Sequence, residues 1–193
     1  MAELNYDYDT QNGQYSDGDI EERMLEMARQ GITYEELPKE QVEFPMVYHF
    51  AGIRENILNW YPFTKQDSVL EIGAGCGALT GMLCEKAGKV TAVELSGRRA
   101  AINYERHKDY DNLTIMVGNL NDMVLEKDFD YIVLNGVLEY AASFTDGETP
   151  YESFLNKMAS FLKHDGKLLV AIENRLGLKY FAGAPEDHTD MYF

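Results

Sequence analysis

From Ser68 onward, short apolar runs alternate with longer amphipathic segments along the chain. The apolar runs are typical of buried strands and lie near residues 68–72, 90–94, 113–117, 130–134 and 167–172. The segments between them favour helices over residues 78–87, 97–108 and about 150–163, with a short helix within 118–129. Strands that alternate with helices form a parallel sheet through right-handed crossovers. The pattern therefore predicts an α/β domain with helices on both faces of its sheet.

The first 44 residues follow a different pattern, and we expect them to form an acidic N-terminal tail and a short helix. Residues 2–22 carry seven acidic side chains and no basic one, a composition that predicts a flexible tail. Asp19 and Glu22 have the spacing of a capping box, and a helix is expected from there to Gly31. The helix face expected to lie against the body of the protein consists of Ile20, Met24, Met27 and Ala28.

The main domain is expected to occupy residues 45–193 and to open with a helix over residues 46–61, between two prolines. Its aromatic side chains, Tyr48, Phe50, Trp60 and Tyr61, are candidates to cover a ligand, although core packing is at least as strong an expectation for Phe50 and Trp60.

Length, charge and composition exclude several classes of protein. A chain of 193 residues has room for one domain with a sizeable core. No run approaches the ~20 apolar residues of a membrane helix, and no export signal is visible, which predicts a cytoplasmic protein without a membrane partner. The formal charge of −16 repels polyanions and speaks against DNA or RNA substrates. Cys76 and Cys84 have no ligand spacing and are expected to be packed thiols.

The first predicted strand runs directly into a glycine-rich turn, Gly73-Ala74-Gly75-Cys76-Gly77, and then into a helix. Such a turn lets a ligand approach the backbone closely and exposes amide groups beside it. The turn also fits the dinucleotide pattern G-x-G-x-x-A. Glu94, at the end of the next strand, could bind the ribose of a dinucleotide or of another nucleoside cofactor. Glu71 distinguishes a dinucleotide site from a site for a cofactor with an amino-acid end. A carboxylate is unfavourable beside a pyrophosphate but suits a cationic amino-acid group.

The pattern Glu71-x-Gly73-x-Gly75-x-Gly77 resembles the first motif of class I methyltransferases, which use S-adenosylmethionine. Gly118-Asn119-Leu120 looks like the adenine-binding turn of that family, although aspartate is frequent where Asn119 stands. The segment 135–140 looks like the part of the family fold that lies beside the sulfonium, and 163–170 like the turn into the fifth strand. The residues that the resemblance assigns to the cofactor are Tyr48, Glu71, Gly73, Ala74, Gly75, Gly77, Glu94, Leu95, Asn119, Leu120, Asn135, Gly136 and Val137.

The resemblance also implies a Rossmann-like sheet with strand order 3-2-1-4-5 and the cofactor at the carboxyl ends of the strands. The family fold normally adds a helix and two strands after the fifth, so we expect these residues to be the N-terminal part of a longer chain with further domains. The fifth strand would then be an apolar sheet edge, and we expect self-association through it or its coverage by a terminal segment. Residues 48–56 and 173–181 resemble bacterial methyltransferases associated with surface-glycan synthesis.

Methyl transfer is a direct displacement that proceeds largely by alignment, so a signature catalytic residue is not required. The catalytic residue is therefore unknown, and the candidates for a general base at the mouth are His49, Glu139, Tyr140 and His188. No metal site is expected, since Glu186, Asp187 and His188 are interpreted as solvated loop residues. His107 and His164 are expected to be partly charged groups at a helix end and a turn.

The expected function is methyl transfer from S-adenosylmethionine to an oxygen or nitrogen of a small-molecule or saccharide acceptor. Asn135 is not followed by the two prolines and aromatic residue of nucleic-acid amino-methylating enzymes, which favours that acceptor class. The alternatives are a non-catalytic S-adenosylmethionine-binding module of a larger protein and, more distantly, an NAD-dependent oxidoreductase.

Overall fold

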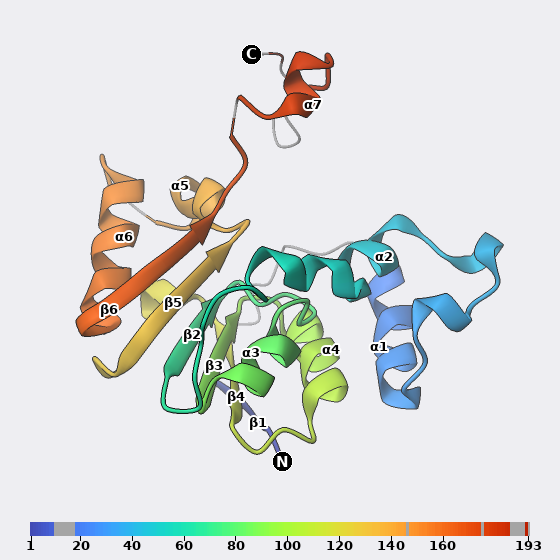
Figure 1. Cartoon of the computed structure of the whole chain (residues 1–193), viewed down its shortest axis with the longest axis horizontal. Coiled ribbons are helices and arrows are strands. Elements are labelled where there is room, and N and C mark those ends of the chain that lie inside the picture. Colours follow the sequence, from blue (N-terminus) through green and yellow to red (C-terminus); the bar gives the residue numbers. More distant parts are fainter. Residues whose placement is uncertain (10–17, 146, 175, 186–191, 193) are drawn as a thin grey trace.

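The computed structural model describes residues 1–9, 18–145, 147–174, 176–185 and 192. Its centre is a six-stranded, fully parallel sheet in the order β1-β4-β3-β2-β5-β6 (Figure 1). The five predicted strands are all present and have the predicted order 3-2-1-4-5. The strands are β1 (Glu3–Tyr8), β2 (Ser68–Ile72), β3 (Lys89–Glu94), β4 (Leu113–Gly118), β5 (Phe129–Asn135) and β6 (Leu162–Ala171).

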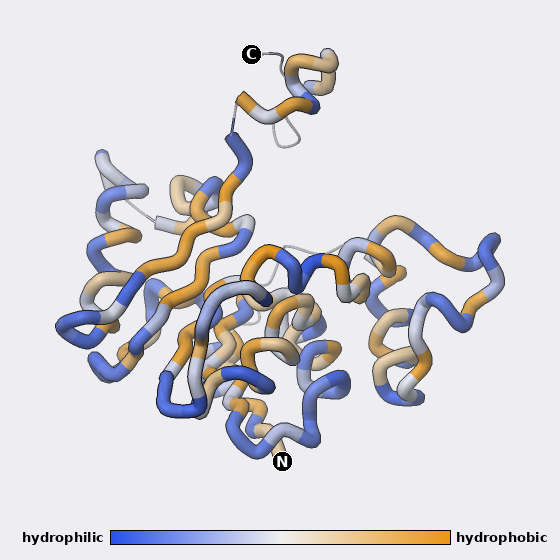
Figure 2. Tube along the Cα trace, viewed as in Figure 1, coloured by the Kyte–Doolittle hydropathy of each residue, from blue (hydrophilic) through white to orange (hydrophobic). Residues whose placement is uncertain are grey.

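Side chains alternate between the two faces of the sheet and build two hydrophobic cores. Val69 points to the face covered by α3 (Thr80–Lys86) and α4 (Gly97–His107), where it packs with Leu83. Leu70 points to the opposite face, which α5 (Ala141–Phe144) and α6 (Pro150–Phe161) cover. Hydrophobic residues are concentrated in the strands and hydrophilic ones in the loops at their ends (Figure 2). The sheet is therefore a rigid support for the loops that follow its strands.

The first strand contradicts the prediction of a flexible tail. β1 pairs in parallel with β4, its Leu4 packs against the core, and only residues 10–17 of the predicted tail lie outside the described residues. Gly118 makes this pairing possible, because its φ of 140° brings its Cα to a point where a Cβ would lie 2.3 Å from the Tyr8 carbonyl oxygen. The acidic composition concealed a strand with alternating apolar residues, since an edge strand needs only one partner and can expose its charged face.

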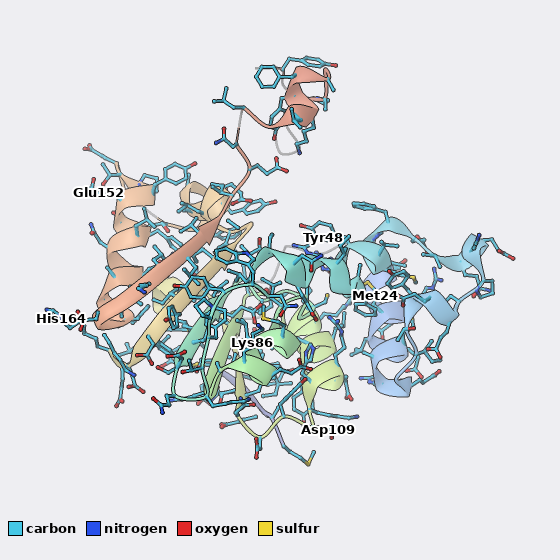
Figure 3. All side chains as sticks on the ribbon, viewed as in Figure 1. Met24, Tyr48, Lys86, Asp109, Glu152 and His164 are labelled. Atoms are coloured by element: carbon cyan, nitrogen blue, oxygen red, sulfur yellow. The ribbon has the colours of Figure 1, made fainter. Side chains whose placement is uncertain are left out.

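The helix α1 (Ile20–Gln30) has the predicted bounds and ends at Gly31 in the left-handed conformation. Its predicted inner face is buried against α4, and Figure 3 shows Met24 between this helix and the body of the protein. The capping box was predicted wrongly, since the Asp19 side chain makes no cap hydrogen bond. The helix is attached to α4 by an ion pair in which Arg99 Nε donates to Glu21 Oε1 at 2.7 Å. Both side chains are buried, so this pair fixes the N-terminal helix to the domain.

The single helix predicted over residues 46–61 is divided into α2 (Phe44–Phe50) and the 3₁₀ helix η3 (Gly52–Ile57). Arg54 donates to the Tyr48 carbonyl at 3.2 Å, the group that the amide of Gly52 would use in a continuous helix. Part of the apolar stripe still reaches the core, since Phe50 and Tyr61 pack against core clusters. Trp60, by contrast, is 74% exposed rather than packed. The remaining short elements are η1 (Tyr34–Glu36), η2 (Lys39–Gln41), η4 (Leu120–Asp122), η5 (Leu138–Tyr140) and α7 (Leu178–Phe181).

Strand β6 ends the sheet on the side opposite β1, as predicted. It pairs only with β5, and its Val170 is 43% exposed. The chain then leaves the sheet and carries α7 away from the other helices (Figure 1). Self-association through this edge stays a prediction. Among the described residues, no helix is long and apolar enough to cross a membrane.

The buried ion pair gives a first testable prediction. Replacement of Glu21 by alanine leaves Arg99 charged and buried beside an empty space, which should lower the free energy of unfolding by about 3–5 kcal/mol. Urea denaturation measures the change. Glu22→Ala, at the exposed neighbouring position of the same helix, is the control and should change stability by less than about 0.5 kcal/mol. Equal effects of the two substitutions would show that the pair does not hold α1.

Candidate functional site

A cavity of about 680 Å³ opens at the carboxyl ends of β2, β3, β4 and β5. Because all strands are parallel, the loops that follow them meet at one edge of the sheet, at the point where the strand order reverses. Every residue predicted to bind the cofactor lines this cavity except Gly77. Three of the four candidate bases, His49, Glu139 and Tyr140, line it as well, whereas His188 lies outside the described residues.

The glycines of the turn after β2 serve different physical purposes. Gly75 has a φ of 55°, and a Cβ built on it meets no atom within 4 Å, so its open side belongs to the cavity. Gly73 has a φ of 65°, and its missing Cβ would lie 2.5 Å from Val137 Cγ2. One glycine therefore leaves room for a ligand, and the other lets the segment after β5 pack against the turn.

Gly77 was predicted to contact the cofactor, but the space beside it is filled by the protein. Its Cβ would lie 2.3 Å from Asn103 Oδ1, and its φ is 85°. The glycine is needed because the turn lies directly on α4, where Asn103 is fully buried. No local pattern indicates this contact, since the two residues come from separate elements.

Glu94 is the last residue of β3, and its carboxylate binds the glycine turn that follows the neighbouring strand β2. Its Oε2 accepts a hydrogen bond from the Gly75 amide at 2.8 Å, and its Oε1 accepts one from the Ser96 amide at 2.8 Å. Burial raises the pKa of Glu94, and the two amide donors counteract that rise. Each oxygen keeps a second lone pair, so the carboxylate can still accept hydrogen bonds from a ligand in the cavity.

Glu71 lies on β2, two residues after Val69, and therefore faces α3 and α4. It is only 4% exposed, and its Oε2 accepts a hydrogen bond from Thr80 Oγ1 at 2.6 Å. Burial raises the pKa of Glu71 to about 7, although the Thr80 hydroxyl favours the charged form. The cavity thus has a wall in which a carboxyl group changes its charge near neutral pH.

His107 does not carry the partial charge expected of a residue at a helix end. It is buried, and burial together with the nearby Arg106 lowers its pKa to about 3. Arg106 occupies the neighbouring position and donates to the backbone carbonyls of Cys76 and His49. The predicted helix-end interaction is wrong because the last turn of α4 faces the glycine turn instead of solvent. His164 is exposed, as Figure 3 shows, and lies 2.9 Å from Asp165 Oδ1.

The mouth of the cavity is formed by α2 and by the segment after β5. Tyr48 is half-exposed, and the Arg54 guanidinium lies 4.0 Å from the centre of its ring. His49 is buried beside it. On the other side, Glu139 Oε2 is buried and has no hydrogen-bond partner among the described residues. That atom is an acceptor with unused capacity at the edge of the cavity.

The turn after β4 contributes Asn119 and Leu120. Asn119 Oδ1 accepts from the Asn121 amide at 2.9 Å, which caps η4 and leaves the side-chain amide nitrogen as a donor. Leu120 is buried and contributes apolar surface.

Cys76 and Cys84 are buried thiols, and burial raises both pKa values to about 12, in agreement with the predicted packing role. Within the described part of the chain, no three His, Cys, Asp or Glu side chains are placed to hold a metal ion. Glu186, Asp187 and His188 are outside that part.

Comparison with known proteins gives curated relatives that match part of the chain. A ribosomal RNA small subunit methyltransferase A of Clostridium botulinum is 35% identical over 89 residues, which is 44% of this chain and 32% of the relative. An uncharacterized methyltransferase of Staphylococcus carnosus is 36% identical over 114 residues, 59% of this chain and 51% of the relative. The chain thus spans about half, or less, of the length of these relatives.

Solved structures share the fold. A Haemonchus contortus phosphoethanolamine N-methyltransferase, solved with phosphoethanolamine and S-adenosylhomocysteine, superposes on 81% of this chain with a TM-score of 0.59 at 20% identity, over 34% of its own length. A methyltransferase solved with the Haloferax volcanii Trm112 activator superposes on 77% with a TM-score of 0.54 at 22% identity, over 59% of that chain.

The family model that matches is described as a methyltransferase domain, and it covers residues 70–168, about half of the chain. This match decides between the two interpretations of the glycine turn, because it includes the turn, Glu94 and the segments after β4 and β5. The chain belongs to the methyltransferase-domain family of class I, whose methyl donor is S-adenosylmethionine.

Proposed function

We propose that this chain holds S-adenosylmethionine in the cavity and directs its methyl group to an oxygen or nitrogen of a small-molecule or saccharide acceptor. The observation that carries the proposal is the surrounding of Gly75, whose open side faces the cavity between two buried carboxyl groups, Glu71 and Glu94. A branched ligand with one cationic end and one diol fits such an arrangement of acceptors.

Different residues of the cavity suit different chemical groups of the cofactor. Glu94 has free lone pairs for the two hydroxyl groups of a ribose, and Glu71 offers a carboxylate to an ammonium group. Asn119 and Leu120 supply an amide and an apolar surface for adenine, and Asn135, Gly136 and Val137 form the opposite wall. When bound, the cofactor supplies a methyl group activated by its sulfonium.

On the acceptor side, Glu139 is the best supported of the candidate bases. Glu139 lines the cavity, and one of its carboxylate oxygens has no partner among the described residues. Its carboxylate can accept a hydrogen bond from a hydroxyl or amine and withdraw its proton as the nucleophile attacks. The cavity is also lined by Glu71, Glu94 and Glu173, of which Glu173 pairs with Lys179. Arg54 and Arg99, the arginines that line it, contact Tyr48 and Glu21. This balance favours an acceptor that is neutral or cationic over an anionic one.

Observations on whether a nucleic acid could be the methyl acceptor point in opposite directions. The formal charge of −16 speaks against a polyanionic acceptor, and the resemblance of residues 48–56 and 173–181 to glycan-associated enzymes favours a saccharide. The relatives, however, include ribosomal RNA methyltransferases, so the comparisons do not support the exclusion of nucleic acids. A small-molecule acceptor therefore stays our proposal, and RNA belongs in its test.

The alternative is a cofactor-binding module without catalysis of its own. The chain covers only part of its relatives, and one structural neighbour was solved with a methyltransferase activator protein. In that case the acceptor site would be completed by another domain or partner.

Cofactor binding is tested with S-adenosylhomocysteine, which has no methyl group to transfer. Gly75→Val should abolish the binding seen in calorimetry, because the branched side chain enters the space that the ligand needs while no protein atom lies within 4 Å of its Cβ. The positive φ adds strain, so circular dichroism must verify the fold. Gly147→Val, at an exposed glycine with a φ of 114°, is the matched control and should bind normally. Normal binding by a folded Gly75→Val protein would contradict this site.

Glu71 should link stability to pH in the ligand-free protein. Its folded-state pKa of about 7 lies above the unfolded value, so its contribution to stability is complete at low pH and is lost as the pH rises through about 7. Compared with the wild type, Glu71→Gln should be more stable by up to about 3 kcal/mol at pH 8, with a smaller difference near pH 5. Urea unfolding at several pH values measures this. Glu148→Gln, at an exposed site, should show no such dependence.

Catalysis is tested with radiolabelled S-adenosylmethionine and a panel of sugars, amino sugars, small amines including phosphoethanolamine, and small-subunit ribosomal RNA. We expect methyl transfer to a sugar or amine, and Glu139→Gln should lower its rate by about 10²–10⁴-fold without changing S-adenosylhomocysteine affinity. Transfer to RNA alone would contradict the proposed acceptor class. Cofactor binding without transfer to any acceptor would favour the non-catalytic module.

A further inference from the structure

A chain of buried hydrogen bonds leads from α4 through α3 to Glu71. Thr80 Oγ1 lies 2.6 Å from Glu71 Oε2, Asn103 Nδ2 lies 3.0 Å from Thr80 Oγ1, and His107 Nδ1 lies 2.8 Å from Asn103 Oδ1. Thr80 and Asn103 are fully buried, and neither lines the cavity. The hydrogen-bonded chain therefore meets the lining of the cavity at Glu71, while Asn103 also packs against Gly77 of the glycine turn.

The direction of every hydrogen bond in this chain follows from chemistry. His107 Nδ1 faces both the backbone carbonyl and Oδ1 of Asn103, two acceptors, so Nδ1 carries the proton. Asn103 Nδ2 can only donate, and Thr80 Oγ1 is its acceptor. The single hydroxyl proton of Thr80 is then left to donate to Glu71.

The space for this chain is provided by two glycines. A Cβ on Gly77 would lie 2.3 Å from Asn103 Oδ1, and one on Gly81 would lie 2.9 Å from His107 Nε2. The role that sequence analysis missed for Gly77 is thus to admit Asn103 beneath the ligand-binding turn.

We infer that Thr80, oriented by Asn103 and His107, is a positioning residue that holds Glu71 as a hydrogen-bond acceptor for the ammonium group of the methyl donor. The inference rests on the proposed function. With Oε2 occupied by the Thr80 hydroxyl, Oε1 is the oxygen left for the ligand. A directed donor favours the ionised carboxylate, which alone attracts an ammonium group.

The charged groups around Glu71 make this donor important. Burial and Glu94 of β3 favour the neutral acid, whereas Arg106 of α4 and the Thr80 hydroxyl favour the carboxylate. These influences balance near neutral pH, so the loss of one donor should move the titration of Glu71 and, with it, the pH range in which the ligand binds.

The test compares the pH dependence of S-adenosylhomocysteine affinity in the wild type and Thr80→Val. The wild-type affinity should rise with pH through about 7. In Thr80→Val the rise should move upward by about one pH unit, a tenfold change in the protonation equilibrium, and Thr80→Ser should restore the wild-type profile. The amino group of the ligand titrates identically in the wild type and the variants, and it affects only the alkaline part of each affinity profile.

Thr91→Val is the control, because it makes the same chemical change at a buried position of β3 that does not line the cavity. It should leave the profile unchanged. If Thr80→Val fails to fold, Thr80→Ala replaces it. An unchanged profile in a folded variant that lacks the Thr80 hydroxyl would overturn the inference and leave the proposed function intact.

A second measurement needs no ligand. The ¹³C resonance of the Glu71 carboxyl, assigned by its absence in Glu71→Gln, should titrate at higher pH in Thr80→Val than in the wild type. Identical titrations would overturn the inference. Absence of any S-adenosylhomocysteine binding by the wild type would instead overturn the proposed function, so the two failures are distinguishable.

Discussion

The site depends on the burial of two carboxyl groups at the ends of neighbouring strands. A carboxylate removed from water must be compensated by hydrogen-bond donors, or it takes up a proton. Glu94 finds its donors in the amides of Gly75 and Ser96, and Glu71 finds its donor in Thr80. The bonds of Glu94 fix the glycine turn against β3, and the bond of Glu71 joins β2 to α3, so the cavity exists with its acceptors already placed.

The same requirement explains why α4 is central to the molecule. On one side it supplies Asn103 to the network beneath the turn, and on the other Arg99 binds Glu21 and holds the N-terminal helix. Arg106 donates to the backbone of both the turn and α2. Changes in the N-terminal region can therefore reach the cavity through one helix, even though β1 and α1 are remote from it in sequence.

The mouth of the cavity beside α2 carries more exposed side chains than the glycine turn does. α2 ends at Phe50, buries Met46 and is held by Arg106, which donates to the His49 carbonyl. Tyr48 at the mouth is half-exposed, with Arg54 over its ring. Methyl transfer proceeds largely by alignment, and the proposed acceptor position lies at this mouth.

The sequence by itself determined the fold class, the five central strands and their order, and part of the cavity lining, namely the turns that follow the strands. It could do so because strand periodicity and the glycine turn are local patterns, and because parallel strands bring their carboxyl ends together. Only the tertiary structure decided the rest. β1 pairs with β4, and Gly118 admits the Tyr8 carbonyl at the end of that pairing. Arg54 binds the Tyr48 carbonyl where the predicted helix over 46–61 divides, and Gly77 faces Asn103. Each of these depends on a contact between side chain and backbone, or between distant elements, and the charge of Glu71 likewise depends on burial, which periodicity and composition do not encode.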